Sequence, residues 1–142
     1  MKEISILGST GSIGTQALDV VRENPDKFAV KALSCGRNIE LMKAQISEFE
    51  PQLVVTETAD DAKLLRAYFK DKTRNIEFAY GEEGLLELAR YDADLLLNSL
   101  SGMRGMLPTY EAIKAGRNIA LANKESLVAG GGVIMSSAAE MG

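Results

Sequence analysis

Short apolar runs alternate with helical patterns along the chain, and this alternation constrains the fold more than any other feature. The apolar runs occupy residues 4–7, 28–33, 53–55, 76–79, 95–97 and 119–122. Between these runs, apolar residues recur at helical spacing from residue 12 to the stop at Asn24-Pro25, and then over 39–49, 59–68, 82–91 and 108–116. From Lys124 onward we expect a mixture of helix and glycine turns.

The alternation predicts parallel strands that are joined by helical crossovers. The strands are continuous apolar runs, which is typical of a sheet covered by helices on both faces. We therefore expect an α/β fold, with a Rossmann-like, doubly wound, mostly parallel sheet. A chain of 142 residues suits one domain, so we expect residues 1–142 to form a single unit.

Composition argues against several classes of function. A net charge of −4 disfavours a general nucleic-acid or membrane-surface binder. The absence of histidine removes Ser-His-Asp and Cys-His catalysis and the commonest metal ligand. The single cysteine, Cys35, excludes an internal disulfide framework and favours a cytoplasmic location. No apolar run approaches ~18 residues, so no membrane span is expected.

The first strand-to-helix junction is the strongest candidate site. Its sequence is Gly8-Ser9-Thr10-Gly11-Ser12-Ile13-Gly14. Gly8 suits a tight turn, Gly11 suits the close approach of a phosphate to the main chain, and Gly14 suits packing of the helix against the strand. The G-x-x-G-x-x-G spacing departs by one residue from the usual dinucleotide fingerprint, but the strand before it and the helix after it are the context that the fingerprint requires.

The same junction supplies hydrogen-bond donors. The N–H groups of the first helical turn are free and lie at the positive end of the helix dipole, which attracts an anion. We expect the hydroxyls of Ser9, Thr10 and Ser12 to add donors and to cap the helix. Together these groups predict a pyrophosphate cradle. The alternative is a structural glycine turn.

The loop after the second strand distinguishes between dinucleotides. An NAD enzyme usually carries Asp or Glu there, to bind the ribose hydroxyls. This chain has Ser34-Cys35-Gly36-Arg37-Asn38 instead. Arg37 would attract a 2′-phosphate, Asn38 can donate as well, and Gly36 lets the loop pass close to the adenosine. We predict NADP(H) over NAD(H); the alternative is that Arg37 is a solvated loop arginine.

Two patterns resemble other NADP-linked oxidoreductases. Tyr110 and Lys114 have the Y-x-x-x-K spacing of short-chain dehydrogenases, but the tyrosine would lie in the first turn of a short helix. We expect a packing tyrosine and a surface lysine there. Semialdehyde dehydrogenases need a nucleophilic cysteine beyond the nucleotide site, whereas Cys35 lies beside the predicted adenine end. We expect Cys35 to be a loop or packing thiol.

A third pattern follows the strand at 119–122, at the sheet edge where α/β proteins bind ligands. It contains Asn123, Lys124 and Glu125. Lys124 can hold an anionic or carbonyl group of a substrate, and the other two can bind ribose or carboxamide groups. The alternative is an ordinary polar helix start.

In combination these segments resemble the 1-deoxy-D-xylulose 5-phosphate reductoisomerase family. The glycine junction, Gly36-Arg37-Asn38, residues 105–109 and residues 121–127 occur in the family's order and spacing. The resemblance implies the N-terminal, NADPH-binding domain of an enzyme that rearranges and reduces 1-deoxy-D-xylulose 5-phosphate. The product is 2-C-methyl-D-erythritol 4-phosphate, on the non-mevalonate route to isoprenoids. It implies a cytoplasmic homodimer as the full-length protein, with a small sugar phosphate as substrate.

The resemblance also assigns residues. It implies a substrate contact at Lys124 and a nicotinamide-side loop around residues 101–106. It implies cofactor contacts at Thr10, Gly11, Ser12, Ile13, Gly36, Arg37, Asn38, Asn123 and Glu125.

The family's metal, Mg²⁺ or Mn²⁺, binds acidic side chains in an Asp-x-Glu segment and a later Glu, which are expected beyond residue 142. The pairs Asp60-Asp61 and Glu82-Glu83 suit first helical turns rather than a metal. We therefore expect no metal ligand and no catalytic residue in this chain, which alone should be inactive. The alternatives are another NADP-linked oxidoreductase, of the semialdehyde or short-chain type, or a nucleotide-sensing module.

Overall fold

The computed structural model describes residues 1–72, 75–100, 106–121 and 133–135, with the backbone alone at 121 and 133–135. Its strands form one sheet in the order β4-β3-β2-β1-β5-β6-β7. The strands are β1 Lys2–Leu7, β2 Phe28–Ser34, β3 Leu53–Thr56, β4 Glu77–Tyr80, β5 Leu95–Asn98, β6 Ile119–Leu121 and β7 Val133–Met135. Strands β1 to β6 are parallel, as predicted.

Strand β7 is the exception, since it pairs antiparallel with β6. The expectation of helix and glycine turn in the tail is therefore wrong at Val133–Met135. The reason is that β6 leaves one sheet edge open, and a run containing the β-branched residues Val133 and Ile134 suits a strand on that edge. Helical and extended patterns cannot be separated over so short an apolar run.

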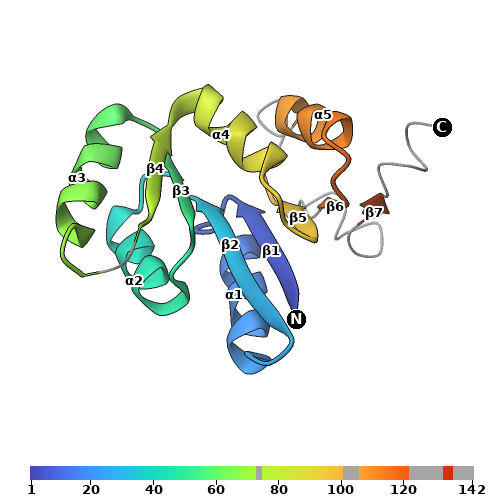
Figure 1. The fold of residues 1–142 in the computed structure, drawn as a ribbon, viewed down its shortest axis with the longest axis horizontal. Helices are drawn as coiled ribbons and strands as arrows, with labels where there is room; N and C mark the ends of the chain where they lie inside the picture. The colour runs from blue at the N-terminus through green and yellow to red at the C-terminus, as the bar shows by residue number, and fades with distance from the viewer. Residues whose placement is uncertain (73–74, 101–105, 122–132, 136–142) are drawn as a thin grey trace.

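Five helices are described in the ranges above, and they cover both faces of the sheet (Figure 1). They are α1 Ser12–Glu23, α2 Ile39–Phe49, α3 Ala59–Phe69, α4 Gly81–Arg90 and α5 Met106–Lys114. The first three pack on one core, which includes the sheet residues Ile6, Leu33 and Val54. Helices α4 and α5 pack on the other core, which includes Leu7 and Val55. The doubly wound prediction is thereby confirmed.

Local chemistry explains the helix starts. The side chain of Asn38 caps α2 by accepting from Leu41 N at 3.1 Å, and that of Thr58 caps α3 by accepting from Asp61 N at 3.1 Å. The pairs Asp60-Asp61 and Glu82-Glu83 lie in first turns, as expected.

Helix α5 begins at Met106, two residues before the predicted start at Pro108. A proline fits this position because the N–H groups of a first turn have no partner within the helix.

Among the described residues, no helix is long and apolar enough to cross a membrane.

The chain order creates a switch point in the sheet. From β1 the strands proceed outward to β4, and the chain then returns to the other side of β1 as β5. At such a point the crossovers diverge, and a crevice opens beyond the carboxyl ends of the two strands. In this protein, Gly8 follows β1 and Ser99 follows β5 at that position.

Candidate functional site

A cavity of about 800 Å³ lies at the carboxyl ends of β1 to β5. It therefore includes the switch point between β1 and β5. The cavity is lined by Gly8, Thr10, Gly11, Ser34, Cys35, Gly36, Arg37, Asn38, Thr56, Glu57, Gly81, Glu82, Leu85, Ser99, Leu100, Leu107 and Pro108. Five of the predicted cofactor residues are brought together here: Thr10, Gly11, Gly36, Arg37 and Asn38.

The turn after β1 is shaped by two glycines. Gly8 has a φ of +83°, and a Cβ there would lie 2.7 Å from Ser99 Oγ. A Cβ on Gly14 would lie 2.2 Å from the carbonyl oxygen of Gly8. The tight-turn role of Gly8 is confirmed. Gly14 allows close packing as predicted, but the partner is the turn itself, through Gly8 and Ser9, rather than the strand.

Helix α1 begins without a side-chain cap. Its N-cap is Gly11, which has no capping hydrogen bond from a side chain. The N–H groups of Ser12, Ile13 and Gly14 belong to the first turn and have no acceptor within the helix. A Cβ on Gly11 would meet only the Gly8 carbonyl oxygen, at 3.6 Å, so the approach to this turn is open. These groups can bind an anion through the main chain.

Ser9 does not play the part expected of it. It is fully buried, and its hydroxyl donates to Gln45 Oε1 at 2.7 Å, so it neither caps α1 nor faces a ligand. The expectation of a donor or cap at Ser9 is wrong because the side chain points into the core between the turn and α2. The sequence analysis assigned no role to Gln45. Its position could have identified it, because a polar residue three positions after Met42 lies on the apolar face of α2 and needs a buried partner.

The loop after β2 is hydrogen-bonded to the same turn. Ser34 Oγ accepts from Gly8 N at 2.8 Å, and the Ser34 carbonyl oxygen accepts from Ser9 N at 2.7 Å. Gly36 N donates to Thr10 Oγ1 at 3.2 Å. The predicted pyrophosphate turn and the predicted 2′-phosphate loop therefore form one connected rim of the cavity.

Arg37 lies on this rim with its side chain 96% exposed. Its Nε is 3.9 Å from a carboxylate oxygen of Glu57, at the end of β3. Such an exposed pair is weak, so the guanidinium can turn to a phosphate in the cavity. Asn38 uses its Oδ1 to cap α2, which leaves its NH₂ group as a donor. Glu57 was missed by the sequence analysis, which assigned no role to the residue after the third strand.

Cys35 is a packing residue, as expected. It is 6% exposed and belongs to the core beneath α1, α2 and α3. Burial, with smaller contributions from Asp61 and Glu57, raises the pKa of the Cys35 thiol to about 12. The thiol therefore stays protonated at neutral pH and is not an activated nucleophile.

The end of β5 fixes the far side of the cavity. Asn98 is buried, and its amide donates to Thr109 Oγ1 at 2.7 Å while its oxygen accepts from Leu100 N at 3.1 Å. The Ser99 hydroxyl donates to the Leu7 carbonyl oxygen at 2.6 Å. These bonds hold the start of the segment that continues toward the predicted nicotinamide loop.

Several predicted residues lie outside the described part of the chain. These are residues 101–105 of the predicted nicotinamide loop, together with Asn123, Lys124 and Glu125. Ser12 and Ile13 are described, but they lie at the start of α1 and do not line the cavity.

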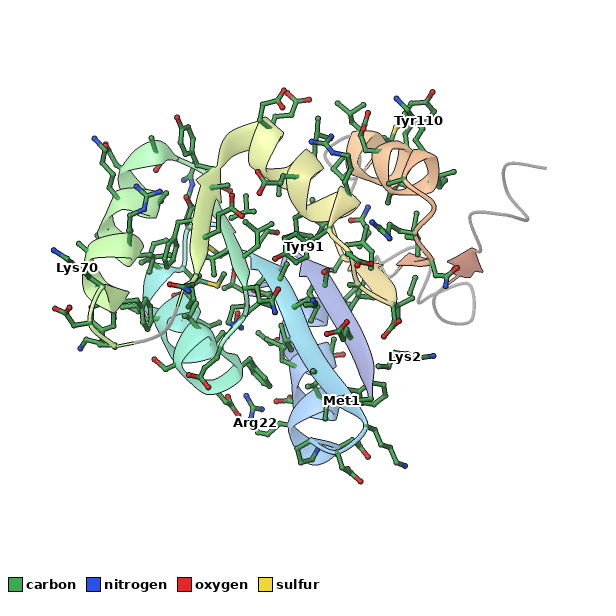
Figure 2. The ribbon with its side chains drawn as sticks, in the orientation of Figure 1. Met1, Lys2, Arg22, Lys70, Tyr91 and Tyr110 are labelled. Carbon is green, nitrogen blue, oxygen red and sulfur yellow. The ribbon has the colours of Figure 1, made fainter. Side chains whose placement is uncertain are left out.

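The Y-x-x-x-K pattern lies away from the cavity, on the surface of α5. Tyr110 is 58% exposed, and Figure 2 shows it projecting outward from the helix. Lys114 Nζ lies 5.4 Å from the centroid of the tyrosine ring. The lysine is on the surface as predicted, but the expectation of a packing tyrosine is wrong, since α5 turns this side toward solvent.

The described residues contain no group of three or more Asp, Glu, Cys or His side chains that is placed to hold a metal ion. The adjacent acidic pairs lie in the first turns of α3 and α4, and Glu82 also lines the cavity.

Known proteins resemble this chain in sequence along nearly its whole length. The family model described as 1-deoxy-D-xylulose 5-phosphate reductoisomerase matches residues 4–131. Proteins of that name from Shouchella clausii and Listeria monocytogenes serotype 4b are 52% and 50% identical to this chain over 141 residues. Each alignment covers 99% of this chain and 36% of the relative, so the chain spans about a third of the length of these relatives.

Solved structures of reductoisomerases share the fold of this chain. The reductoisomerase from Zymomonas mobilis in complex with NADPH superposes with a TM-score of 0.78 at 32% identity, covering 91% of this chain and 34% of that one. A reductoisomerase in complex with NADPH, fosmidomycin and magnesium superposes with a TM-score of 0.81 at 33% identity, covering 90% of this chain and 31% of that one.

Proposed function

The chain belongs to the 1-deoxy-D-xylulose 5-phosphate reductoisomerase family, and on that premise we propose that residues 1–142 are the NADPH-binding domain of such an enzyme. One observation carries the proposal. The cavity at the switch point combines an uncapped helix N-terminus with an exposed guanidinium on one hydrogen-bonded rim. The two features match the two anionic groups of NADPH, which are the pyrophosphate that NADH shares and the 2′-phosphate that NADH lacks.

The whole protein's activity is part of the proposal. The longer protein would convert 1-deoxy-D-xylulose 5-phosphate to 2-C-methyl-D-erythritol 4-phosphate in non-mevalonate isoprenoid biosynthesis. It would do so as a cytoplasmic homodimer, without nucleic-acid or membrane partners. Because this chain spans about a third of its relatives, we expect it to bind the cofactor without turnover.

Each residue has a proposed part in holding the cofactor. Thr10, Gly11 and the main-chain N–H groups of Ser12 and Ile13 would hold the pyrophosphate. The segment Gly36-Arg37-Asn38 would hold the 2′-phosphate. When bound, NADPH supplies the hydride for reduction, and the protein orients it. Asn123 and Glu125 are proposed as further cofactor contacts.

The family match favours this function over the semialdehyde and short-chain dehydrogenase alternatives. A nucleotide-sensing module would use the same two phosphate subsites and would leave Lys124, the proposed substrate contact, without a ligand. Acetylation of Lys124 in the longer enzyme, with and without the sugar phosphate, separates the two. Protection by substrate supports the enzyme, and unchanged labelling supports the sensor.

A divalent metal, Mg²⁺ or Mn²⁺, is proposed for the longer enzyme. Similar structures were obtained in complex with magnesium. The described residues of this chain do not fit such an ion, because they offer no cluster of acidic ligands. We therefore propose that residues outside this described part of the chain hold the metal.

Calorimetric titration with NADPH and NADH tests the cofactor assignment. We expect tighter binding of NADPH, a large loss of that preference in Arg37→Glu, and partial retention in Arg37→Lys, which keeps the charge but loses the planar, bidentate geometry. NADH binding should change little in either variant, because it carries no 2′-phosphate. Equal affinities of the unmodified chain for the two dinucleotides would refute the assignment.

A further inference from the structure

A reciprocal pair of hydrogen bonds joins the turn after β1 to helix α2. The Ser9 hydroxyl donates to Gln45 Oε1 at 2.7 Å, and Gln45 Nε2 donates back to the Ser9 carbonyl oxygen at 2.9 Å. Ser9 is fully buried and Gln45 is 4% exposed. Neither residue lines the cavity, so the pair does not touch a ligand there.

The two partners belong to elements with different tasks in the proposed function. Ser9 lies inside the turn that presents Gly11 and the start of α1. Gln45 lies on α2, whose first residues follow directly from Arg37 and the Asn38 cap. The other hydrogen bonds described between this turn and its neighbours reach the end of β2, at Ser34, the loop, at Gly36, and Ser99 after β5. Ser9 Oγ also lies 3.7 Å from Met42 Sδ on α2, which is a longer and weaker contact. The Ser9–Gln45 pair therefore holds the turn to the helix itself.

We infer that Gln45 is a positioning residue, which acts through Ser9 to set the distance between the pyrophosphate turn and the 2′-phosphate site. Two opposed hydrogen bonds fix both the separation and the orientation of the turn and the helix. A ligand that bridges two elements binds more tightly when their separation is set before it arrives. The inference rests on the proposed function, and it adds a specificity determinant that lies outside the cavity.

Packing alone does not require this pair. Replacing both members of a buried hydrogen-bonded pair with apolar groups of similar shape can be nearly neutral for stability. In this pair the Ser9 carbonyl oxygen belongs to the main chain and would lose its Gln45 donor, so some stability should be lost in the double variant as well. Apolar contacts are not directional, so they fix the separation of the turn and the helix less closely than hydrogen bonds do. A positioning role and a stabilising role therefore predict different results for the same substitutions.

The test compares two ligands that differ by one phosphate. Adenosine 2′-monophosphate reaches only the loop at Gly36-Arg37-Asn38, whereas adenosine 2′,5′-bisphosphate also reaches the turn. Calorimetry measures both dissociation constants for the unmodified chain, for Gln45→Met and for the Ser9→Ala/Gln45→Met double variant. Ile46→Val is the matched control, because it loosens the fully buried neighbouring position of α2 without touching Ser9.

We expect the 5′-phosphate to tighten binding in the unmodified chain and in Ile46→Val. In both Gln45 variants, the gain from the 5′-phosphate should fall about tenfold, while affinity for the monophosphate stays within about twofold. If Gln45→Met does not fold, the double variant decides, because it also removes the Ser9 hydroxyl, which would otherwise keep only its long contact to Met42 Sδ. If that variant also fails to fold, Ser9→Ala decides, with an expected drop of about threefold for the one bond lost.

The outcomes separate this inference from the function on which it rests. A folded Gln45 variant with an unchanged gain from the 5′-phosphate overturns the positioning role and leaves NADPH binding intact. A parallel loss for both ligands also overturns it, because that pattern reports general disruption. Failure of the unmodified chain to bind NADPH or either nucleotide overturns the proposed function, and the inference with it.

Discussion

Gly14→Ala is the substitution for which the structure and helix propensity make opposite predictions. Gly14 lies in the first turn of α1, where alanine is intrinsically better than glycine by up to about 1 kcal/mol. The added Cβ would, however, lie 2.2 Å from the Gly8 carbonyl oxygen and 2.7 Å from Ser9 Cα. These are backbone atoms that no side-chain rotation can move, so the turn or the helix must shift by about 1 Å to restore a normal contact of about 3.5 Å.

The magnitude follows from these two contributions. Overpacking in a tight site costs about 1–3 kcal/mol, and a backbone contact this short belongs at the upper end. After the propensity gain is subtracted, we expect a net loss of about 2 kcal/mol in the free energy of unfolding. Since domains of this size are stable by about 5–15 kcal/mol, the variant should still fold. Its NADPH affinity should fall as well, because the shift displaces the anion-binding turn.

Urea unfolding followed by circular dichroism measures the loss, and Gly11→Ala is the control. A Cβ on Gly11 meets nothing closer than 3.6 Å, so this variant should lose about 0.5–1 kcal/mol, from the poorer N-cap alone. It should nevertheless weaken NADPH binding, since the methyl group lies where a phosphate must approach. A Gly14→Ala variant at least as stable as the unmodified chain would refute the packing argument.

Three further predictions concern stability, pH and salt. Ser5 Oγ is buried without a hydrogen-bond partner, so Ser5→Ala should raise the free energy of unfolding by about 1 kcal/mol in urea titrations; a loss would show that the hydroxyl is satisfied. Burial, then the charge and hydrogen bond of Glu77, raise the pKa of Glu87, so the ionised form costs stability above that pKa. Glu87→Gln should therefore stabilise the chain at pH 7, by an amount that shrinks as the pH falls toward 4.5, the ordinary pKa of a glutamate. Thermal melts at several pH values measure the gain, and a gain that did not change with pH would contradict this prediction. Because Arg37 is almost fully exposed, salt should screen its attraction for the 2′-phosphate, and the preference for NADPH over NADH should shrink between about 0.01 M and 1 M salt. Parallel titrations with the two dinucleotides measure this preference, and an unchanged preference would point to a buried 2′-phosphate site.

Local patterns predicted the parts of this fold that local chemistry dictates. The strand and helix order, the Gly8 turn and the Arg37 loop all follow from residues that are adjacent in sequence, and the structure has them there. Ser9 could not be assigned in this way, because its partner Gln45 is 36 positions away and only the packing of α2 brings the two together. Strand β7 was missed for the same reason, since its pairing depends on the open edge of β6.

The charges around the cavity explain why the two phosphate subsites must differ in kind. Within the described part of the lining, Arg37 is the only cation, and Glu57 and Glu82 are anions. On the proposed function, the pyrophosphate would bind the uncharged main-chain N–H groups at the start of α1, which attract the pyrophosphate of either dinucleotide equally. The proposed 2′-phosphate would add charge near the Glu57 carboxylate, so its binding depends on the Arg37 guanidinium to outweigh that repulsion. The proposed function therefore assigns affinity for any dinucleotide to the turn after β1, and the choice between dinucleotides to the loop after β2.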